Sequence, residues 1–286
     1  MPATRVPAYL LSVAALASIL VLVARGLSIP ITHLAPLYMF TPLFATLIAV
    51  RRWDPFWALV AGGARRPAWF AIAWLAPPLV AAGAVALSVA LPDTSFSIGL
   101  EGLRRFGLTP PPPPSHGASF LASRVALGLV ASFLPNALLA LAEEIGWRGL
   151  LVQEWLPRWG FWRCALLVGV AWGLWHAPLV LAGHNYPQHP ALGVAMMTVF
   201  CVLWSPLLLL LRVRTGAVLA PALCHGALNA FGGLSVALVS GGSDLTAGLL
   251  GLPGLAILAA LNGGLAWQLC RTPEVGRPLE ASRSET

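Results

Sequence analysis

The sequence predicts an all-α polytopic membrane protein, with about eight transmembrane helices enclosing a polar cavity. Of its 286 residues, 58% are hydrophobic and 9% are charged, whereas about a quarter of the residues in a typical soluble domain are charged. The mean hydropathy is +0.81. A helix needs roughly 20 apolar residues to cross about 30 Å of hydrocarbon, and eight apolar runs approach that length. The composition therefore excludes an ordinary soluble fold.

The predicted spans follow one another along nearly the whole chain. Their approximate bounds are 8–24, 34–50, 68–91, 124–152, 163–182, 192–211, 216–239 and 247–270. The first two are short for a bilayer. The first could also be a signal peptide by its length, but the seven spans that follow favour a first transmembrane helix.

The polar connections are too short to form a soluble domain. The connection 92–123 contains five consecutive prolines, which predict an extended spacer. Residues 271–286 are polar and mixed in charge, and we predict a disordered cytoplasmic tail there. Residues 1–286 are therefore predicted to form a single integral-membrane domain.

The arginines predict the orientation of the chain, because cytoplasmic loops of membrane proteins are enriched in basic residues. With eight spans, the N-terminus, the even-numbered loops and the C-terminal segment hold 12 arginines, and the opposite loops hold only Arg25, Arg104 and Arg105. Both termini are therefore predicted to be cytoplasmic. The net charge of +7 follows from this topology and does not indicate nucleic-acid binding.

The fourth span contains two adjacent glutamates, Glu143 and Glu144, with Arg148 one turn further on. A charge near mid-bilayer costs roughly 2.5–3.5 kcal/mol on insertion scales, so such residues usually face a cavity or a partner. Residues four apart share a helix face, which predicts an ion pair between Glu144 and Arg148. A purely structural pair explains these two residues but leaves Glu143 free to exchange a proton.

Two further polar clusters lie in the fifth and seventh spans. Trp172 and His176 are four residues apart in one, and His225 and Asn229 are four apart in the other. A lone intramembrane histidine is often only hydrogen-bonded between helices. Measured from the predicted cytoplasmic ends, however, both clusters and Glu143 lie about 14–20 Å deep, at 1.5 Å per residue. We therefore predict one polar cavity.

A carboxylate facing two imidazoles and an amide is suited to activating water for hydrolysis. The glutamate would act as general base, and a histidine or asparagine would donate to an oxyanion. Zinc stays open as a cofactor because His and Glu are acceptable ligands, although the H-E-x-x-H helix of common zinc proteases is absent. The four cysteines lack C-x-x-C spacing, so we interpret them as packing residues.

The three clusters resemble the signature of the CPBP family, the CAAX proteases and bacteriocin-processing enzymes, which includes the CAAX prenyl endopeptidase of the endoplasmic reticulum. The first motif of that family, Glu-Glu-x-x-x-Arg, and the third, His-x-x-x-Asn, are matched in full. In the second motif, usually Phe-x-x-x-His, Trp172 replaces the phenylalanine. The resemblance implies an eight-helix intramembrane endopeptidase in which the first glutamate activates water.

The resemblance also implies a role for each matched residue. Glu143 would activate a water shared with His176. His225 and Asn229 would stabilise the oxyanion, and the Glu144–Arg148 pair would shape the site. The implied catalytic residues are Glu143, Glu144, Arg148, His176, His225 and Asn229, and the residues expected to line the substrate cavity are Trp147 and Trp172.

The expected substrate is a peptide or prenylated protein at the membrane, cut near a CAAX-type C-terminus or in a leader peptide. It would enter a cavity open toward the cytoplasm or the bilayer. The lipid bilayer is the other expected partner, and the expected location is a bacterial plasma membrane. A proton-coupled transporter is one alternative, because buried Glu–His networks also build proton relays, but matching halves are not evident. A bacteriocin-immunity or other partner-binding protein without catalysis is the second.

Overall fold

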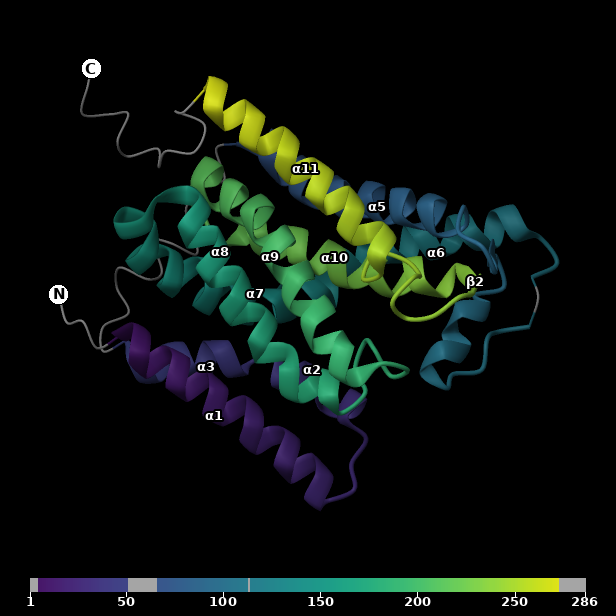
Figure 1. Ribbon diagram of the computed structural model, residues 1–286, viewed down its shortest axis with the longest axis horizontal. Coiled ribbons are helices and arrows are strands. Elements are labelled where there is room, and N and C mark those ends of the chain that lie inside the picture. The colour runs from purple at the N-terminus through teal and green to yellow at the C-terminus, as the bar shows by residue number, and fades with distance from the viewer. Residues whose placement is uncertain (1–4, 51–65, 113, 273–286) are drawn as a thin grey trace.

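The computed structural model describes residues 5–50, 66–112 and 114–272, and most of them are helical (Figure 1). The helices are α1 (Arg5–Gly26), α2 (Ile31–Tyr38), α3 (Thr41–Ala49), α5 (Pro67–Ser88), the 3₁₀ helix η1 (Glu101–Phe106), α6 (Gly117–Ala131), the π-helix η2 (Ser132–Ala137), α7 (Leu138–Glu144), the π-helix η3 (Ile145–Leu151), α8 (Val152–Leu181), α9 (Pro190–Thr215), α10 (Leu219–Ala237) and α11 (Leu252–Arg271). The strands β1 (Thr94–Phe96) and β2 (Val239–Gly241) pair antiparallel, with Thr94 opposite Gly241. The predicted all-α membrane fold is confirmed.

Six helical stretches within the described residues are long and apolar enough to cross a membrane. One of them, Gly117–Leu181, is 65 residues long and contains the predicted fourth and fifth spans. Its helix is interrupted at Gly160, where φ is +68°. Trp172 and Glu143 are 29 residues apart yet joined by a hydrogen bond, whereas a continuous helix would separate them by about 44 Å. The chain therefore reverses between them and crosses the membrane twice.

The predicted second span, 34–50, is not one continuous helix. It is divided into α2 and α3 near Met39, and neither part is as long as a transmembrane helix. Pro36 lies inside α2 and Pro42 near the start of α3, where a proline ring favours a new helix start over continuation of the previous one. The number of eight spans is therefore only approximate. The predicted tail, 271–286, lies almost entirely outside the described residues.

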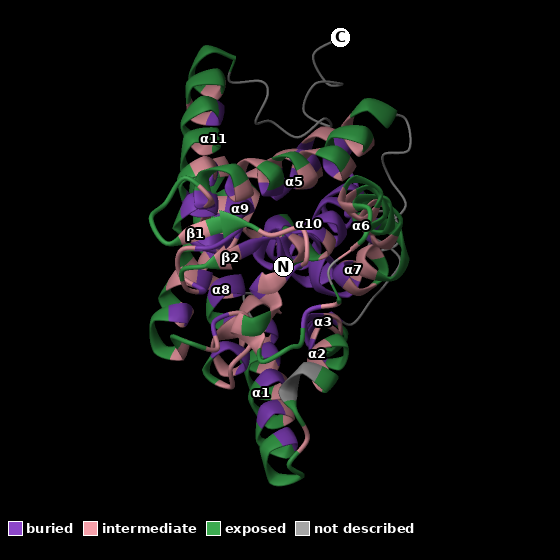
Figure 2. Cartoon of the chain, turned by 90° about the vertical axis from the view of Figure 1, so that its right-hand side faces the viewer, coloured by how far each residue is buried: buried purple, intermediate pink, exposed green. Residues whose placement is uncertain are grey.

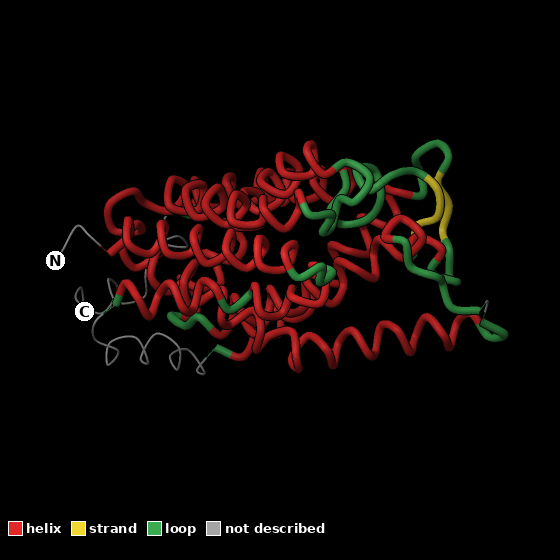
Figure 3. Tube along the Cα trace, turned by 90° about the horizontal axis from the view of Figure 1, so that it is seen from below, coloured by secondary structure: helices red, strands yellow, loops and turns green. Residues whose placement is uncertain are grey.

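The two ends of the helical bundle differ in what they carry (Figure 3). The start of α1 and the end of α11 lie at one end, which we call the arginine-rich end because Arg5, Arg212, Arg214 and Arg271 lie there. The opposite end carries β1, β2, η1 and the connection 182–189, and we call it the strand end.

Helix α10 runs through the middle of the bundle, where burial is greatest (Figure 2). Gly226 permits this position, because a Cβ atom there would lie 2.6 Å from the backbone nitrogen of Ala137 and from the carbonyl oxygen of Ser132. The close approach brings the third polar cluster, on α10, against the helices that carry the first.

Candidate active site

The two glutamates lie at the junction of α7 and the π-helix η3. Both are buried, with Glu143 2% and Glu144 0% exposed. π-Helical turns are rare and frequently occur at functional sites. The predicted ion pair is present, since Arg148 Nη1 donates to Glu144 Oε1 at 3.0 Å and both side chains are fully buried.

Glu144 also connects the first polar cluster to the third. His225 Nδ1 lies 2.8 Å from Glu144 Oε1, the same oxygen that accepts from Arg148. Because an ionised carboxylate only accepts, this bond places a proton on Nδ1. The Arg148 guanidinium lies 4.7 Å from the ring centre of Trp172, a cation–π contact. One buried network therefore joins all three clusters.

Glu143 is hydrogen-bonded by Trp172, the residue that replaces the phenylalanine of the family's second motif. Trp172 Nε1 donates to Glu143 Oε2 at 3.0 Å, and both groups are buried. A phenylalanine at this position could not make that bond. Sequence analysis assigned Trp172 only to the cavity wall, because a hydrogen bond between α7 and α8 depends on the rotation of one helix against the other.

His176 is oriented by its own helix. Its Nδ1 lies 2.9 Å from the carbonyl oxygen of Trp172, and because a carbonyl only accepts, Nδ1 carries the proton. The ring also packs edge-on against Trp175, with centroids 4.6 Å apart. With Nδ1 engaged in both His176 and His225, each histidine has its Nε2 available for another partner.

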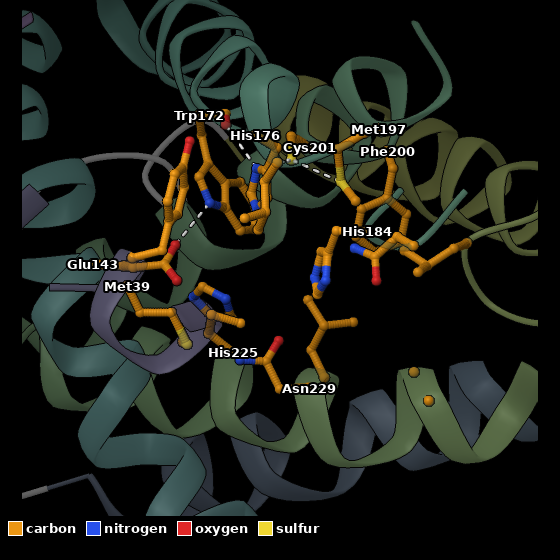
Figure 4. A pocket seen from close by; sticks show the side chains of 18 of the residues that line it. Met39, Glu143, Trp172, His176, His184, Met197, Phe200, Cys201, His225 and Asn229 are labelled. Atoms are coloured by element: carbon orange, nitrogen blue, oxygen red, sulfur yellow. Dashed lines mark hydrogen bonds between the residues drawn. The ribbon is translucent and has the colours of Figure 1, made fainter. Parts of the chain in front are cut away.

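A cavity of about 310 Å³ connects these groups (Figure 4). Five of the eight residues predicted for the site line it, namely Glu143, Trp172, His176, His225 and Asn229. Glu144 and Arg148 do not line it, and they lie behind Glu143 in the buried network.

Trp147 was predicted to line the cavity and does not. Its ring is fully buried and packs edge-on against Tyr9 and Trp175, with centroid distances of 5.5 and 5.9 Å. In a regular α-helix Trp147 would share a face with Glu143, four residues earlier. The wider turn of the π-helix η3, which begins at Ile145, points the Trp147 side chain in a different direction from that of Glu143.

Sequence analysis missed several polar residues of the cavity. Asn136, His184 and Asn185 also line it. Asn136 belongs to η2, and the other two follow the end of α8. They lie outside the three motifs. Asn136 is seven residues before Glu143, the spacing of one helix face over two turns, and this signal could have pointed to it. No such spacing relates His184 and Asn185 to Glu143. Cys201, interpreted from the sequence as a packing residue, is buried on α9 and also reaches the cavity wall.

Comparison with known proteins finds a family that is similar to the segment carrying these residues. Residues 123–231 match the family described as Type II CAAX prenyl endopeptidase Rce1-like, and this segment contains all three polar clusters. Over this segment the chain is similar to the CAAX protease family. The assignment predicted from the motifs is therefore confirmed.

One relative in this family is a protein of Methanococcus maripaludis named CAAX prenyl protease 2. It is 37% identical to this chain over 49 residues, which cover 17% of this chain and 18% of that protein. The aligned stretch is thus less than a fifth of either protein. It supports the family but does not transfer the activity or the substrate of the relative.

The described side chains do not form an evident zinc site. Among the described residues, no three His, Cys, Asp or Glu side chains gather closely enough to hold a metal ion. Glu143, His176 and His225 surround the cavity without forming such a group. A metalloprotease, which the sequence left open through zinc, therefore has no support from the positions of these side chains.

His184 gives the site a testable dependence on pH. It lies after the end of α8, outside the membrane-spanning stretch, and burial lowers its pKa to about 4. An unfolded histidine has a pKa of about 6.5. Between these two pH values the unfolded state binds more protons than the folded state. The contribution of the neutral His184 to the free energy of unfolding is therefore fully present above about pH 6.5 and is lost as the pH falls toward 4.

We expect His184→Gln to reduce the loss of thermal stability on acidification. The measurement is Tm in detergent at about pH 7.5 and about pH 5, that is, above and below the unfolded-state pKa of about 6.5. The exposed His116 provides the control, His116→Gln, which should lose as much Tm as the wild type. An undiminished loss in His184→Gln would contradict the prediction.

Proposed function

We propose that the protein is an intramembrane endopeptidase that hydrolyses a peptide bond of a membrane-associated polypeptide, with Glu143 as general base. The observation that carries this proposal is the position of Glu143. Its carboxylate is anchored by Trp172 on one oxygen and lines a cavity that His176, His225 and Asn229 also line. The similarity of residues 123–231 to the CAAX prenyl endopeptidase family supports the same reaction class.

In the proposed reaction, Glu143 accepts a proton from a water molecule. The water oxygen bonds to the carbonyl carbon of the scissile peptide, and His176 Nε2 accepts a hydrogen bond that orients the water. The proton held by Glu143 then passes to the leaving amine as the carbon–nitrogen bond breaks. One peptide and one water thus give a carboxylic acid and an amine.

The oxyanion requires hydrogen-bond donors at the moment of attack. The Asn229 amide can donate without a change of protonation. His225 has its Nδ1 proton directed at Glu144, so its Nε2 donates only when the ring is an imidazolium. The Glu144 carboxylate would compensate that charge, which gives the Glu144–Arg148 pair a role in shaping the site.

The cavity walls suggest the kind of peptide that would fit. Apolar side chains, including Phe106, Phe200 and Leu228, alternate with the polar groups around the space. Such walls favour an extended segment with uncharged side chains, as in a CAAX-type C-terminus or a leader peptide. We propose that both termini lie in the cytoplasm, on the distribution of the arginines, and that the membrane is a bacterial plasma membrane.

The experiment that tests this function is mass spectrometry of a library of prenylated peptides and leader peptides. Purified wild-type protein in lipid and the Glu143→Ala variant are incubated with the library in parallel. Cleavage products that only the wild type forms would support the proposal and locate the scissile bond. Identical profiles would contradict it and favour a partner-binding protein. A parallel incubation with a chelator shows whether cleavage needs a metal.

The Trp172 hydrogen bond leads to a prediction about rate. A hydrogen bond to a charged group contributes about 1.5–3 kcal/mol, so we expect Trp172→Phe to lower kcat by roughly 10–100-fold. KM should stay near its wild-type value, because the bond positions the base and does not bind substrate.

The matched control is Trp74→Phe. This variant also loses an indole hydrogen bond, the one that Trp74 donates to the Leu129 carbonyl at 3.1 Å. Trp74 does not line the cavity. Its kcat should equal that of the wild type. Steady-state kinetics of both variants measure the difference, and equal kcat values in Trp172→Phe and wild type would show that this bond does not assist Glu143.

A further inference from the structure

We propose that His184 and Asn185 bind the main chain of the substrate peptide, and that Asp244 is the residue that positions them. The inference rests on the proposed function and deepens it, because it assigns substrate-binding residues to the same cavity. Three observations carry it. They are the hydrogen-bonding groups that His184 and Asn185 present to the cavity, the left-handed backbone at Asn185, and a buried set of hydrogen bonds that fixes the connection carrying both residues.

His184 and Asn185 line the cavity that Glu143 also lines, and Figure 4 shows the His184 ring facing the same space as Asn229. Within the described part of the chain, neither side chain is hydrogen-bonded to another residue. Burial lowers the pKa of His184 to about 4, so its ring is neutral near pH 7 and has one donor and one acceptor. The Asn185 amide also donates and accepts. Both side chains therefore have hydrogen-bonding capacity to offer a ligand.

The main chain of a peptide matches this capacity. Each non-proline residue carries one N–H donor and one C=O acceptor, which need partners when the peptide leaves water for a largely apolar cavity. In the proposed reaction, His176, His225 and Asn229 act on the water and the oxyanion. His184 and Asn185 have no role in that reaction and remain available to the residues beside the scissile bond.

The backbone after α8 brings both side chains to the same space. Asn185 has a φ of +63°, in the left-handed region that asparagine adopts more readily than most other residues. Gly183, two residues earlier, has a φ of +98°. Adjacent side chains of an extended chain point to opposite sides, whereas His184 and Asn185 both reach the cavity. The irregular backbone thus presents two neighbouring residues to one ligand.

Asp244, on the connection 242–251 between β2 and α11, fixes the residues that follow Asn185. Its side chain is 3% exposed, and its two oxygens have different partners. Oδ2 accepts from the Gln188 backbone N–H at 2.7 Å, and Oδ1 lies 2.6 Å from His189 Nδ1. In return, Gln188 Oε1 accepts from the Asp244 backbone N–H at 2.9 Å. We call these three hydrogen bonds the Asp244 clasp, and they join two connections that are far apart in the sequence.

Tyr186 forms a second link between the same two connections. Its hydroxyl donates to the Leu250 carbonyl at 2.8 Å, and Leu250 itself lines the cavity. Its side chain packs against α9 at Gly193, where a Cβ atom would lie 2.4 Å from the Tyr186 Cβ. His184 and Asn185 therefore lie between the end of α8 and a segment that is held in place. Holding them before the peptide arrives lowers the entropy that binding must remove.

The test measures binding of the same library of prenylated peptides and leader peptides to immobilised protein in lipid. Every protein carries Glu143→Gln, so that bound peptides are not cut, and mass spectrometry of the retained peptides gives a Kd for each. Asn185→Gly removes the amide and tolerates the left-handed backbone, and His184→Ala removes the imidazole. Each variant loses neutral hydrogen bonds to the peptide, so we expect Kd to rise roughly 2–10-fold in each.

The role of Asp244 is tested by the same measurement, although Asp244 does not line the cavity. Asp244→Ala removes the clasp and should raise Kd, whereas Asp244→Asn keeps an oxygen that can accept from the Gln188 N–H and should raise it less. If Asp244 acts through Asn185, combining Asp244→Ala with Asn185→Gly should raise Kd by less than the product of the two single effects. Glu154→Ala breaks an ion pair away from the cavity and should leave Kd unchanged.

The outcomes separate this inference from the proposed function. An unchanged Kd in either Asn185→Gly or His184→Ala would overturn the proposal, and so would a failure of the Glu143→Gln protein to retain any peptide. Effects of Asp244→Ala and Asn185→Gly that multiply in full would overturn the positioning role of Asp244, because the two residues would then act independently. Peptides that are retained through His184 and Asn185 but that the wild type does not cleave would refute the proposed function and leave peptide binding standing.

Discussion

Replacing Glu143 with glutamine is expected to lower kcat for peptide cleavage by about 10²–10⁴-fold, the usual contribution of a general base. Glutamine has nearly the same shape, and its amide oxygen can still accept the hydrogen bond from Trp172 that holds Glu143. It cannot accept a proton from water at neutral pH. The loss should therefore appear in kcat, with KM and Tm close to those of the wild type.

The control for this change is Glu154→Gln. Glu154 is another acid of the same helical stretch, but it pairs with Arg158 at 3.4 Å, away from the cavity. Its kcat should be unaffected. Steady-state kinetics on a peptide identified by the library experiment provide the measurement. If Glu143→Gln cleaves that peptide as fast as the wild type, another group must activate the water.

Much of this site could be predicted from the sequence because its residues follow the periodicity of a helix. The i, i+4 spacing of Glu144 and Arg148 predicted their ion pair, and the similar depth of the polar clusters predicted a common cavity. Charge is so costly in a bilayer that intramembrane glutamates already indicate a partner or a cavity. These inferences needed only the rise and period of a helix.

The remaining features depend on geometry that helical periodicity does not contain. The bond between Trp172 and Glu143 requires the rotation of α8 against α7, and the position of Trp147 depends on the π-helical turns that follow Glu144. His184 lies after the end of α8, where no period applies.

The second large effect is expected in stability, from Arg148→Ala. Arg148 and Glu144 are both fully buried, and removing one partner leaves a buried charge with less compensation. Breaking such a pair costs about 3–5 kcal/mol. For a chain of this size we expect Tm to fall by roughly 10 °C, since about 1 kcal/mol corresponds to 2–4 °C in domains of 150–250 residues.

The chain contains a close control for this effect. Arg158 and Glu154 have the same i, i+4 spacing, but the arginine side chain is 56% exposed, and exposed pairs contribute about 0–1 kcal/mol. Arg158→Ala should therefore change Tm little. The comparison separates the effect of burial from that of the sequence pattern, which is identical in the two pairs.

A double variant distinguishes an uncompensated charge from lost packing. If the cost of Arg148→Ala arises from the carboxylate that remains, then adding Glu144→Gln should recover part of the lost Tm, because the remaining group is neutral. If the cost arises from the lost contact between the guanidinium and the Trp172 ring, the second change should recover nothing. Thermal unfolding of the two single variants and the double variant in one detergent decides between these explanations, and a wild-type Tm in Arg148→Ala would contradict both.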